Sequence, residues 1–332
     1  MSHPSRRTLR IAAPALAIAM LPGCTTAPGS GAVGGVPDGF PVVVDNCGTE
    51  IRFDAPPERV MLLESAPVTI LDGIGVFDRV SARAGSFPLE YYDDQLAGAV
   101  SRVPALSDDV DASGHVVISQ EQIIAQTPDL VLGQLDGISR ETLAGAGATV
   151  MVQELLCPGD TVEASFDTLY AEIDRYGQVF DRRGESAALV DDLRSRVDAV
   201  RARTAGRDRR TAAVLYPSTG GGPLYAYGSG SMAQPQLEAA GLDNVFAAND
   251  ERVFEVQFEQ LISADPDVLI LLHQGPDDGV ERAVTSLPGA QTIDAVAEGR
   301  VITQLFNFTE PASPLTVAGL EKISARLEGG IR

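Results

Sequence analysis

Two segments, 121–132 (EQIIAQTPDLVL) and 259–270 (EQLISADPDVLI), decide how this chain folds. They match along their whole length without a gap. In each, an expected helix ends before Pro-Asp and an apolar strand follows, because proline stops a helix and Pro-Asp favours a turn. The next expected strands, 149–152 and 300–304, echo each other too. A repeat of this kind predicts two related lobes.

Short apolar strands alternate with helices on both sides of the repeat. Such alternation is typical of parallel sheets that are covered by helices on both faces. Residues 161–204 interrupt it, because Leu189, Leu193, Val197 and Val200 recur on one face of a helix over 185–203. We therefore predict an α/β fold of two lobes with parallel sheets, joined by a single long α-helix. The other expected strands are 59–63, 79–84, 211–216 and 267–272. A helix that Ser65 can cap and Gly75 ends is expected after the first of them, and the other expected helices are 142–146, 234–240, 257–264 and 315–327.

The N-terminus has the layout of an export signal. Three arginines precede the apolar run 11–21, and the sequence LPGC follows directly. A basic start and a short apolar run are typical of secretory signals, and the ending resembles a lipobox, in which the cysteine is acylated. We expect 1–23 to be a lipoprotein signal peptide and Cys24 to anchor the protein to the outer face of the cytoplasmic membrane. Residues 5–10 also resemble a twin-arginine signal, so the choice between Sec and Tat export stays open.

The mature chain divides into four expected parts. Residues 24–40 are Gly-, Ala-, Pro- and Ser-rich, which is typical of a flexible tether. Residues 41–160 form the N-terminal α/β lobe and 161–206 a helical linker that includes the long helix. Residues 207–332 form the C-terminal α/β lobe.

Charge and cysteine content narrow the class of protein. A net charge of −21 argues against a nucleic-acid partner, which would select a basic surface. Besides Cys24, only Cys47 and Cys157 remain, and they lack the spacing of zinc or redox sites. Because two lone cysteines outside the cytosol are usually bonded, we predict a Cys47–Cys157 disulfide.

Motifs of catalysis and of metal binding are missing from the sequence. It has no Gly-x-Ser-x-Gly elbow, no His-Glu-x-x-His and no Walker loop. The mature chain has only His115 and His273, whereas a zinc or manganese site needs clustered imidazoles. We expect no enzyme activity, no protein-bound metal and no cofactor. An extracytoplasmic α/β enzyme acting on a metal chelate stays as the alternative from another class.

The ordered motifs together resemble a known family. Asn46-Cys47-Gly48, the segment 55–60 (APPERV), the segment 71–75 (LDGIG), both Pro-Asp segments and the lipobox resemble the cobalamin and iron-siderophore group of periplasmic-type binding proteins. The resemblance implies two Rossmann-like lobes on one rigid helix, with the ligand between them. It also implies a monomer that delivers a small metal chelate to an ABC permease dimer with its ATPase subunits.

The ligand that this resemblance implies is an iron(III)–siderophore complex, whose iron needs no protein ligand. Parallel lobes bind ligands beyond the carboxyl ends of their strands, and an arginine or tyrosine there can bind a chelate. Haem is a rival, with His115 and Tyr225 or Tyr227 as axial ligands, and cobalamin is another; which chelate binds stays open. The candidate ligand-binding residues are Glu64, Arg83, Phe87, His115, Gln134, Tyr216, Tyr225, Tyr227, His273, Phe306 and Asn307.

Glu121 and Glu259 occupy the same position in the two halves of the repeat. A glutamate at a helix start is favourable beside the helix dipole, which explains either residue alone. In the family that the sequence resembles, glutamates at these motif positions pair with permease arginines. The resemblance therefore implies that Glu121 and Glu259 dock the protein onto its permease.

Overall fold

The computed structural model describes residues 39–108, 116–133, 139–159, 162–218 and 222–330. The predicted signal peptide and Cys24 lie outside these residues. No helix within the described ranges is long and apolar enough to cross a membrane. The limits that we predict for the tether and for each lobe stay predictions.

The N-terminal lobe is built on a five-stranded sheet in the order β5-β4-β3-β6-β7, with every pair parallel. The chain runs outward from central β3 to β5, then returns to β6 on the other side of β3. The carboxyl ends of β3 and β6 therefore form the topological switch point, where such sheets bind ligands. The elements are β3 (Val60–Leu62), α1 (Ala66–Gly73), β4 (Val80–Ala84), α2 (Asp94–Arg102), β5 (Ala105–Ser107), α3 (Gln120–Ala125), β6 (Leu130–Leu132), α4 (Arg140–Gly145) and β7 (Thr149–Met151).

The C-terminal lobe is built on a six-stranded sheet in which β10, β8, β12 and β13 are parallel. Strands β9 and β11 extend it as an antiparallel edge, which the expectation of a purely parallel sheet missed. Helices α7 and α11 pack on one face, and α8, α9 and α10 cover the other. The elements are β8 (Arg210–Pro217), β9 (Leu224–Tyr227), α7 (Ala233–Ala239), β10 (Leu242–Asn244), β11 (Val253–Val256), α8 (Phe258–Ala264), β12 (Val268–His273), α9 (Val280–Thr285), α10 (Asp294–Ala297), β13 (Val301–Leu305) and α11 (Pro314–Glu328).

The repeated Pro-Asp segments perform the same task in both lobes. Asp129, before β6, accepts hydrogen bonds from the backbone N–H groups of Glu58 and Arg59 at 2.8 and 2.9 Å. Asp267, before β12, accepts one from the backbone N–H of Thr211 at 2.8 Å. Each aspartate thus fixes the start of the central strand of its own sheet. This shared role explains why both halves of the internal repeat have an aspartate at this position.

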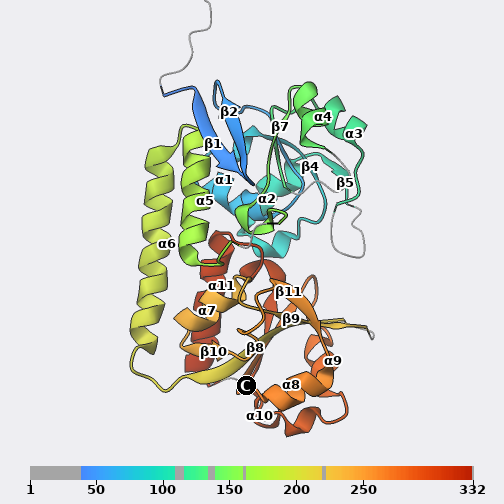
Figure 1. The fold of residues 1–332 in the computed structure, drawn as a ribbon, viewed down its shortest axis with the longest axis vertical. Coiled ribbons are helices and arrows are strands. Elements are labelled where there is room, and N and C mark those ends of the chain that lie inside the picture. Colours follow the sequence, from blue (N-terminus) through green and yellow to red (C-terminus); the bar gives the residue numbers. More distant parts are fainter. Residues whose placement is uncertain (1–38, 109–115, 134–138, 160–161, 219–221, 331–332) are drawn as a thin grey trace, which may run out of the picture. The chain divides into compact units, whose positions relative to one another are not determined.

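The long helix α6 (Arg183–Thr204) packs beside α5 (Phe166–Val179), as Figure 1 shows. Its apolar stripe is buried in a core cluster that includes residues of both sheets. Arg196 on α6 also forms an ion pair with Glu321 on α11 at 2.7 Å. The single long helix is confirmed. The core cluster that it joins contains residues of both lobes, so the two lobes share one continuous core.

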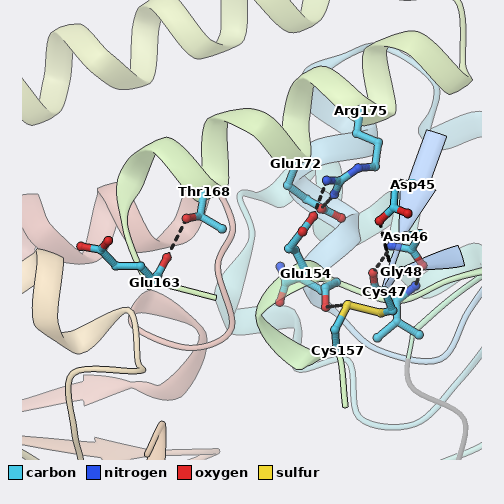
Figure 2. A network of polar contacts seen from close by, with 12 residues as sticks. Asp45, Asn46, Cys47, Gly48, Glu154, Cys157, Glu163, Thr168, Glu172 and Arg175 are labelled. Carbon is cyan, nitrogen blue, oxygen red and sulfur yellow. Dashed lines mark hydrogen bonds and ion pairs between the residues drawn. A yellow bond between two sulfur atoms is a disulfide. The ribbon is translucent and has the colours of Figure 1, made fainter. Parts of the chain in front are cut away.

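A hairpin of β1 (Val42–Asn46) and β2 (Thr49–Phe53) precedes the first sheet. Its turn residue Cys47 forms the predicted disulfide with Cys157, which confirms that pairing (Figure 2). The buried side chain of Asn46 exchanges two hydrogen bonds with the backbone of Val152, at 2.7 and 2.9 Å. Arg140 donates to the same asparagine side chain at 2.8 Å. The hairpin is therefore fixed to the end of β7 both covalently and by hydrogen bonds.

Candidate functional site

The two lobes meet beyond the ends of β3 and β7 in the first sheet and of the edge strand β13 in the second. Ser65 follows β3, and Asn307 lies in the 3₁₀ turn η5 (Phe306–Phe308) after β13. The Asn307 side-chain amide donates to the Ser65 hydroxyl at 2.6 Å, and both residues are buried. The Gln153 side chain also donates to the backbone carbonyl of Ala312. We call the residues around these contacts, at the carboxyl ends of the strands, the interlobe site.

Ser65 behaves differently from the sequence-based expectation. It stands at the N-cap position of α1, where its hydroxyl was expected to cap the helix. The side chain makes no capping hydrogen bond, since the backbone of Ser65 is itself helical (φ −88°, ψ −15°), and the hydroxyl accepts from Asn307. Helix α1 thus lacks a side-chain cap at its N-terminus, and the Ser65 hydroxyl instead forms a hydrogen bond between the lobes.

Aromatic rings line this junction. Tyr216, at the end of β8, meets the ring of Phe306 edge to face at 5.8 Å between centroids. Tyr91 in the N-terminal lobe meets Phe308 in the same manner at 6.3 Å, and its neighbour Tyr92 at 6.2 Å. The predicted residues Tyr216 and Phe306 are thus together. Sequence reasoning missed Tyr91 and Tyr92, although two adjacent tyrosines in a chain without tryptophan were a visible signal.

Arg83 and Phe87, both predicted from the end of β4, form one unit. The guanidinium lies 5.2 Å from the centre of the Phe87 ring, and Nη1 is 3.3 Å from the Asp108 carboxylate. The Arg83 side chain is only 15 % exposed. Its Nε–H is buried and meets no hydrogen-bond partner among the described residues. A buried donor left unpaired costs about 1–3 kcal/mol, so this atom is poised for an acceptor from elsewhere.

The hydroxyl groups of Tyr91 and Tyr92 are likewise buried donors without a hydrogen-bond partner of standard geometry among the described residues. Tyr91 lies close to the backbone of Asn307 and Tyr92 close to the Ser65 hydroxyl. Burial raises the pKa of both phenols, so they stay protonated and offer neutral O–H donors.

Glu64 is a partly buried carboxyl at the end of β3. Burial, together with the nearby charge of Glu172 on α5, raises the pKa of Glu64 to about 7, and Arg252 opposes the rise. Burial likewise raises the pKa of Glu172 to about 7 against the opposing effect of Arg175, which binds both Glu172 and Glu154 (Figure 2). These charges come from separate elements and therefore gave no local sequence signal.

Arg252 has a partner of its own in the C-terminal lobe. Its Nη1 lies 3.1 Å from the carboxylate of Glu310, whose side chain is only 1 % exposed. Glu310 also accepts from the backbone N–H of Met232 at 2.5 Å. Sequence reasoning missed this ion pair as well.

The other candidates have varied surroundings. Tyr225 is 37 % exposed and lies opposite Tyr216 in the β8–β9 ladder, whereas Tyr227 is 3 % exposed and part of the core. His273 Nδ1 lies 2.9 Å from the carbonyl oxygen of Gly275. It lines a depression of about 510 Å³ together with Lys322 and other residues of β13 and α11. His115 and Gln134 lie outside the described residues.

Glu121 and Glu259 are both exposed in the first turn of their helices, α3 and α8. Hydrogen bonds from its own backbone N–H and from the Ser119 hydroxyl lower the pKa of Glu121. Neither carboxylate forms an ion pair with another described residue. Both are therefore available to a partner.

The fold and the sequence agree with a known family. Its sequence model, described as periplasmic binding protein, matches residues 60–304. The chain belongs to this family. A solved structure from an ABC-type Fe³⁺-hydroxamate transport system of Saccharomonospora viridis is 52 % identical. The match covers 88 % of this chain and 99 % of that one, with a TM-score of 0.82.

More distant structures share the fold. A periplasmic heme-binding protein from Pseudomonas aeruginosa is 17 % identical over 83 % of this chain and 94 % of that one, with a TM-score of 0.67. The vitamin B12-binding protein of Vibrio cholerae is 18 % identical over 82 % and 97 %, with a TM-score of 0.61. No curated protein matches the sequence. Among the described residues, no three His, Cys, Asp or Glu side chains are grouped so that they could hold a metal ion.

Proposed function

We propose that this protein is the extracytoplasmic solute-binding component of an ABC importer, and that it captures a ferric hydroxamate siderophore between its lobes. The observation that carries the proposal is the 52 % identity to a protein of an Fe³⁺-hydroxamate transport system over 88 % of the chain. In this role the protein binds its ligand, returns it unchanged and performs no catalysis.

The interlobe site supports this ligand class. A siderophore saturates its iron, so the protein has to supply only shape, aromatic faces and a few polar groups. Tyr216 and Phe306 supply aromatic faces. The buried donors of Arg83, Tyr91 and Tyr92, which have no partner of standard geometry in the described part of the chain, suit the oxygen atoms that surround a chelated iron.

Ligand titration tests the proposal directly. The chain has seven tyrosines and no tryptophan, so quenching of tyrosine fluorescence reports binding. The mature protein should bind a ferric trihydroxamate more tightly than haem, cobalamin or a ferric tris-catecholate, and release it chemically unchanged. Tighter binding of haem or cobalamin, or turnover of the chelate, would contradict the proposal.

Two substitutions test the site. Arg83→Gln should weaken ferric trihydroxamate binding by about tenfold to a hundredfold, since a hydrogen bond from a charged donor contributes about 1.5–3 kcal/mol. Tyr92→Phe should weaken it by up to about tenfold, because a neutral hydrogen bond contributes about 0.5–1.5 kcal/mol. Tyr170→Phe is the matched control, since Tyr170 stacks on Arg194 beside α6. Unchanged affinity in both site variants would remove them from the site.

We further propose that Glu121 and Glu259 dock the protein onto the permease dimer, one carboxylate to each subunit. Both are exposed at equivalent positions of the repeat. The double substitution Glu121→Ala/Glu259→Ala should abolish uptake and leave ligand affinity intact. The control pair Glu141→Ala/Glu281→Ala, also exposed in first helical turns, should transport normally. Normal uptake by the first variant would exclude this docking role.

The lipid anchor and the monomeric state belong to the same proposal. The LPGC sequence that ends at Cys24 supports acylation of that cysteine. Mass spectrometry of protein extracted from membranes should find an acylated N-terminal Cys24, and Cys24→Ala should release the protein. Cleavage at another residue would exclude the anchor. Light scattering of the mature protein should give the mass of one chain.

A further inference from the structure

An exposed tyrosine lies beside the aromatic rings of the interlobe site. In the antiparallel ladder of β8 and β9, Tyr225 lies directly opposite Tyr216. Tyr216 in turn meets the Phe306 ring edge to face at 5.8 Å. Residues opposite each other in such a ladder have their side chains on one face of the sheet, with Cβ atoms about 5 Å apart. Tyr225 therefore extends the pair of rings by one strand and makes it a row of three.

The packing of β9 confirms which face of the sheet this row occupies. Tyr227 belongs to the core cluster against which Tyr216 also packs, whereas Ala226 belongs to the cluster that α8, α9 and α10 cover. Because side chains alternate along a strand, Tyr225 and Tyr227 share the face of Tyr216. Tyr227 is 3 % exposed and Tyr225 37 % exposed. The face thus passes from the protein core to an open surface between these two tyrosines.

An ion pair fixes this edge of the sheet to the junction of the lobes. Arg252, directly before β11, lies 3.1 Å from the carboxylate of Glu310. Glu310 lies just after η5, whose Asn307 donates to Ser65 of the first lobe at 2.6 Å. Strand β11 pairs along its length with β9. The strand that presents Tyr225 is therefore anchored beside the contact that defines the interlobe site.

A ring at this position has two available roles. It can stabilise the edge of the sheet through its cross-strand neighbour, which contributes about 0.2–1 kcal/mol, or it can offer a flat face to a ligand. The first role explains why Tyr225 stands opposite Tyr216, and the exposed face is left for the second. On its outer side Tyr225 is paired with Glu255 of β11, which is exposed. From Tyr216 to Glu255 the row covers two strand spacings, about 10 Å, and ends in solvent.

The ferric complexes of the proposed function differ in what lies beyond the iron. A linear trihydroxamate encloses the iron and leaves its chain ends free, whereas a cyclic trihydroxamate has no free end. Each hydroxamate loses one proton on binding iron(III), so both complexes are uncharged when the chain ends are uncharged. A free alkyl arm that lies on aromatic rings removes apolar surface from water, at about 25 cal/mol per Å². An aromatic row beside the iron-binding region therefore favours the linear complex.

We infer that Tyr225 forms an outer subsite of the interlobe site, which binds the free alkyl arm of a linear ferric trihydroxamate along Phe306, Tyr216 and Tyr225. This inference rests on the proposed function and deepens it. It names linear complexes with a free arm as the preferred class of ligand, and Tyr225 as the residue that distinguishes them from cyclic ones.

A linear and a cyclic complex of equal charge test the subsite. The linear ferric trihydroxamate ends in an acetamide, so that both complexes are uncharged. Calorimetric titration should show that the wild type binds the linear complex about tenfold more tightly, which corresponds to about 1.4 kcal/mol. Tyr225→Thr keeps a residue that favours strands. It should weaken binding of the linear complex by about tenfold and that of the cyclic complex by less than about twofold.

Two further variants identify the ring as the cause. Tyr225→Phe should retain the preference for the linear complex, because it keeps the aromatic face. Val43→Thr, at an exposed apolar position on β1, should leave both affinities unchanged. Thermal unfolding verifies that the variants are folded, and the comparison of the two complexes in the wild type depends on no variant.

The possible results separate the subsite from the proposed function. Equal affinity of the wild type for the two complexes, or an equal loss for both in Tyr225→Thr, would overturn the subsite and leave the proposed function standing. Loss of the preference in Tyr225→Phe would overturn the role of the aromatic face. Binding of neither complex by the wild type would overturn the proposed function and the subsite with it.

Discussion

Removal of the Cys47–Cys157 disulfide should destabilise the protein without displacing the hairpin that it holds. The bridge joins residues separated by 110 positions. Closing a loop of that length removes conformational entropy from the unfolded chain, worth about 4–5 kcal/mol at 25 °C. In Cys47→Ala/Cys157→Ala, the free energy of unfolding should fall by up to that amount.

The folded state should change little in this variant. Asn46 keeps its two hydrogen bonds to the Val152 backbone, at 2.7 and 2.9 Å, and the one from Arg140 at 2.8 Å. The hairpin therefore stays docked beside β7, and ligand affinity should match that of the wild type. Because the unfolded chain becomes less compact without the bridge, the denaturant dependence of unfolding should become steeper.

Urea unfolding followed by far-ultraviolet circular dichroism measures both quantities. Asn46→Ala serves as the complementary variant, since it keeps the bridge and removes the hydrogen bonds. A loss below about 1 kcal/mol in the cysteine variant, with an unchanged slope, would refute the entropic reasoning. Free thiols in the unfolded, unreduced wild-type protein would refute the bridge itself.

Three further outcomes follow from the described contacts. Glu64 and Glu172 both have a pKa of about 7 in the folded protein, against an ordinary 4.5, so the folded state binds more protons than the unfolded state. The stability that these two groups contribute is therefore complete below about pH 4.5 and is lost as the pH rises through about 7. Glu64→Gln should therefore make urea unfolding less dependent on pH in that window, and an unchanged dependence would exclude Glu64. Gly319→Ala should lower the free energy of unfolding by about 3 kcal/mol, since the new Cβ would stand 1.7 Å from the Phe308 carbonyl oxygen. Gly98→Ala in α2 has room for its Cβ and should raise the free energy of unfolding by about 0.5–1 kcal/mol. Thermal unfolding of both variants tests this contrast. Ligand addition should barely change the radius of gyration, because α6 packs into a core that the lobes share, and a change of many ångströms in small-angle scattering would contradict it.

The sequence predicted most of the fold because its strands and helices have distinct local patterns. The apolar runs around 130–132 and 268–272 could only be buried strands beside their Pro-Asp turns. Strands β9 and β11 were not predicted because Leu224–Tyr227 and Val253–Val256 are short. Their antiparallel pairing depends on tertiary contacts, of β9 with β8 and of β11 with β9. The β-propensity of a short segment contains little information about which strand it pairs with.

The site was predictable only where a strand end marks it. Arg83 and Tyr216 lie near the carboxyl ends of β4 and β8, and Phe306 directly follows β13. Tyr91 is the last residue of a 3₁₀ turn, Leu89–Tyr91, and does not lie at a strand end, so the rule about strand ends overlooked it. The Arg252–Glu310 pair joins residues far apart in the chain, and no spacing pattern reveals such a contact.

The position of the disulfide in the chain has a consequence for how the protein is made. All five strands of the first sheet lie between the two bridged cysteines. A polypeptide that emerges from its N-terminus can therefore form that sheet and oxidise the bridge before the second lobe is available. Asn307 and Ala312, which contact Ser65 and Gln153 across the junction, emerge near the end. The interlobe site is thus the last part to assemble, and a chain interrupted after α6 would hold a closed disulfide and an unpaired first lobe that binds nothing.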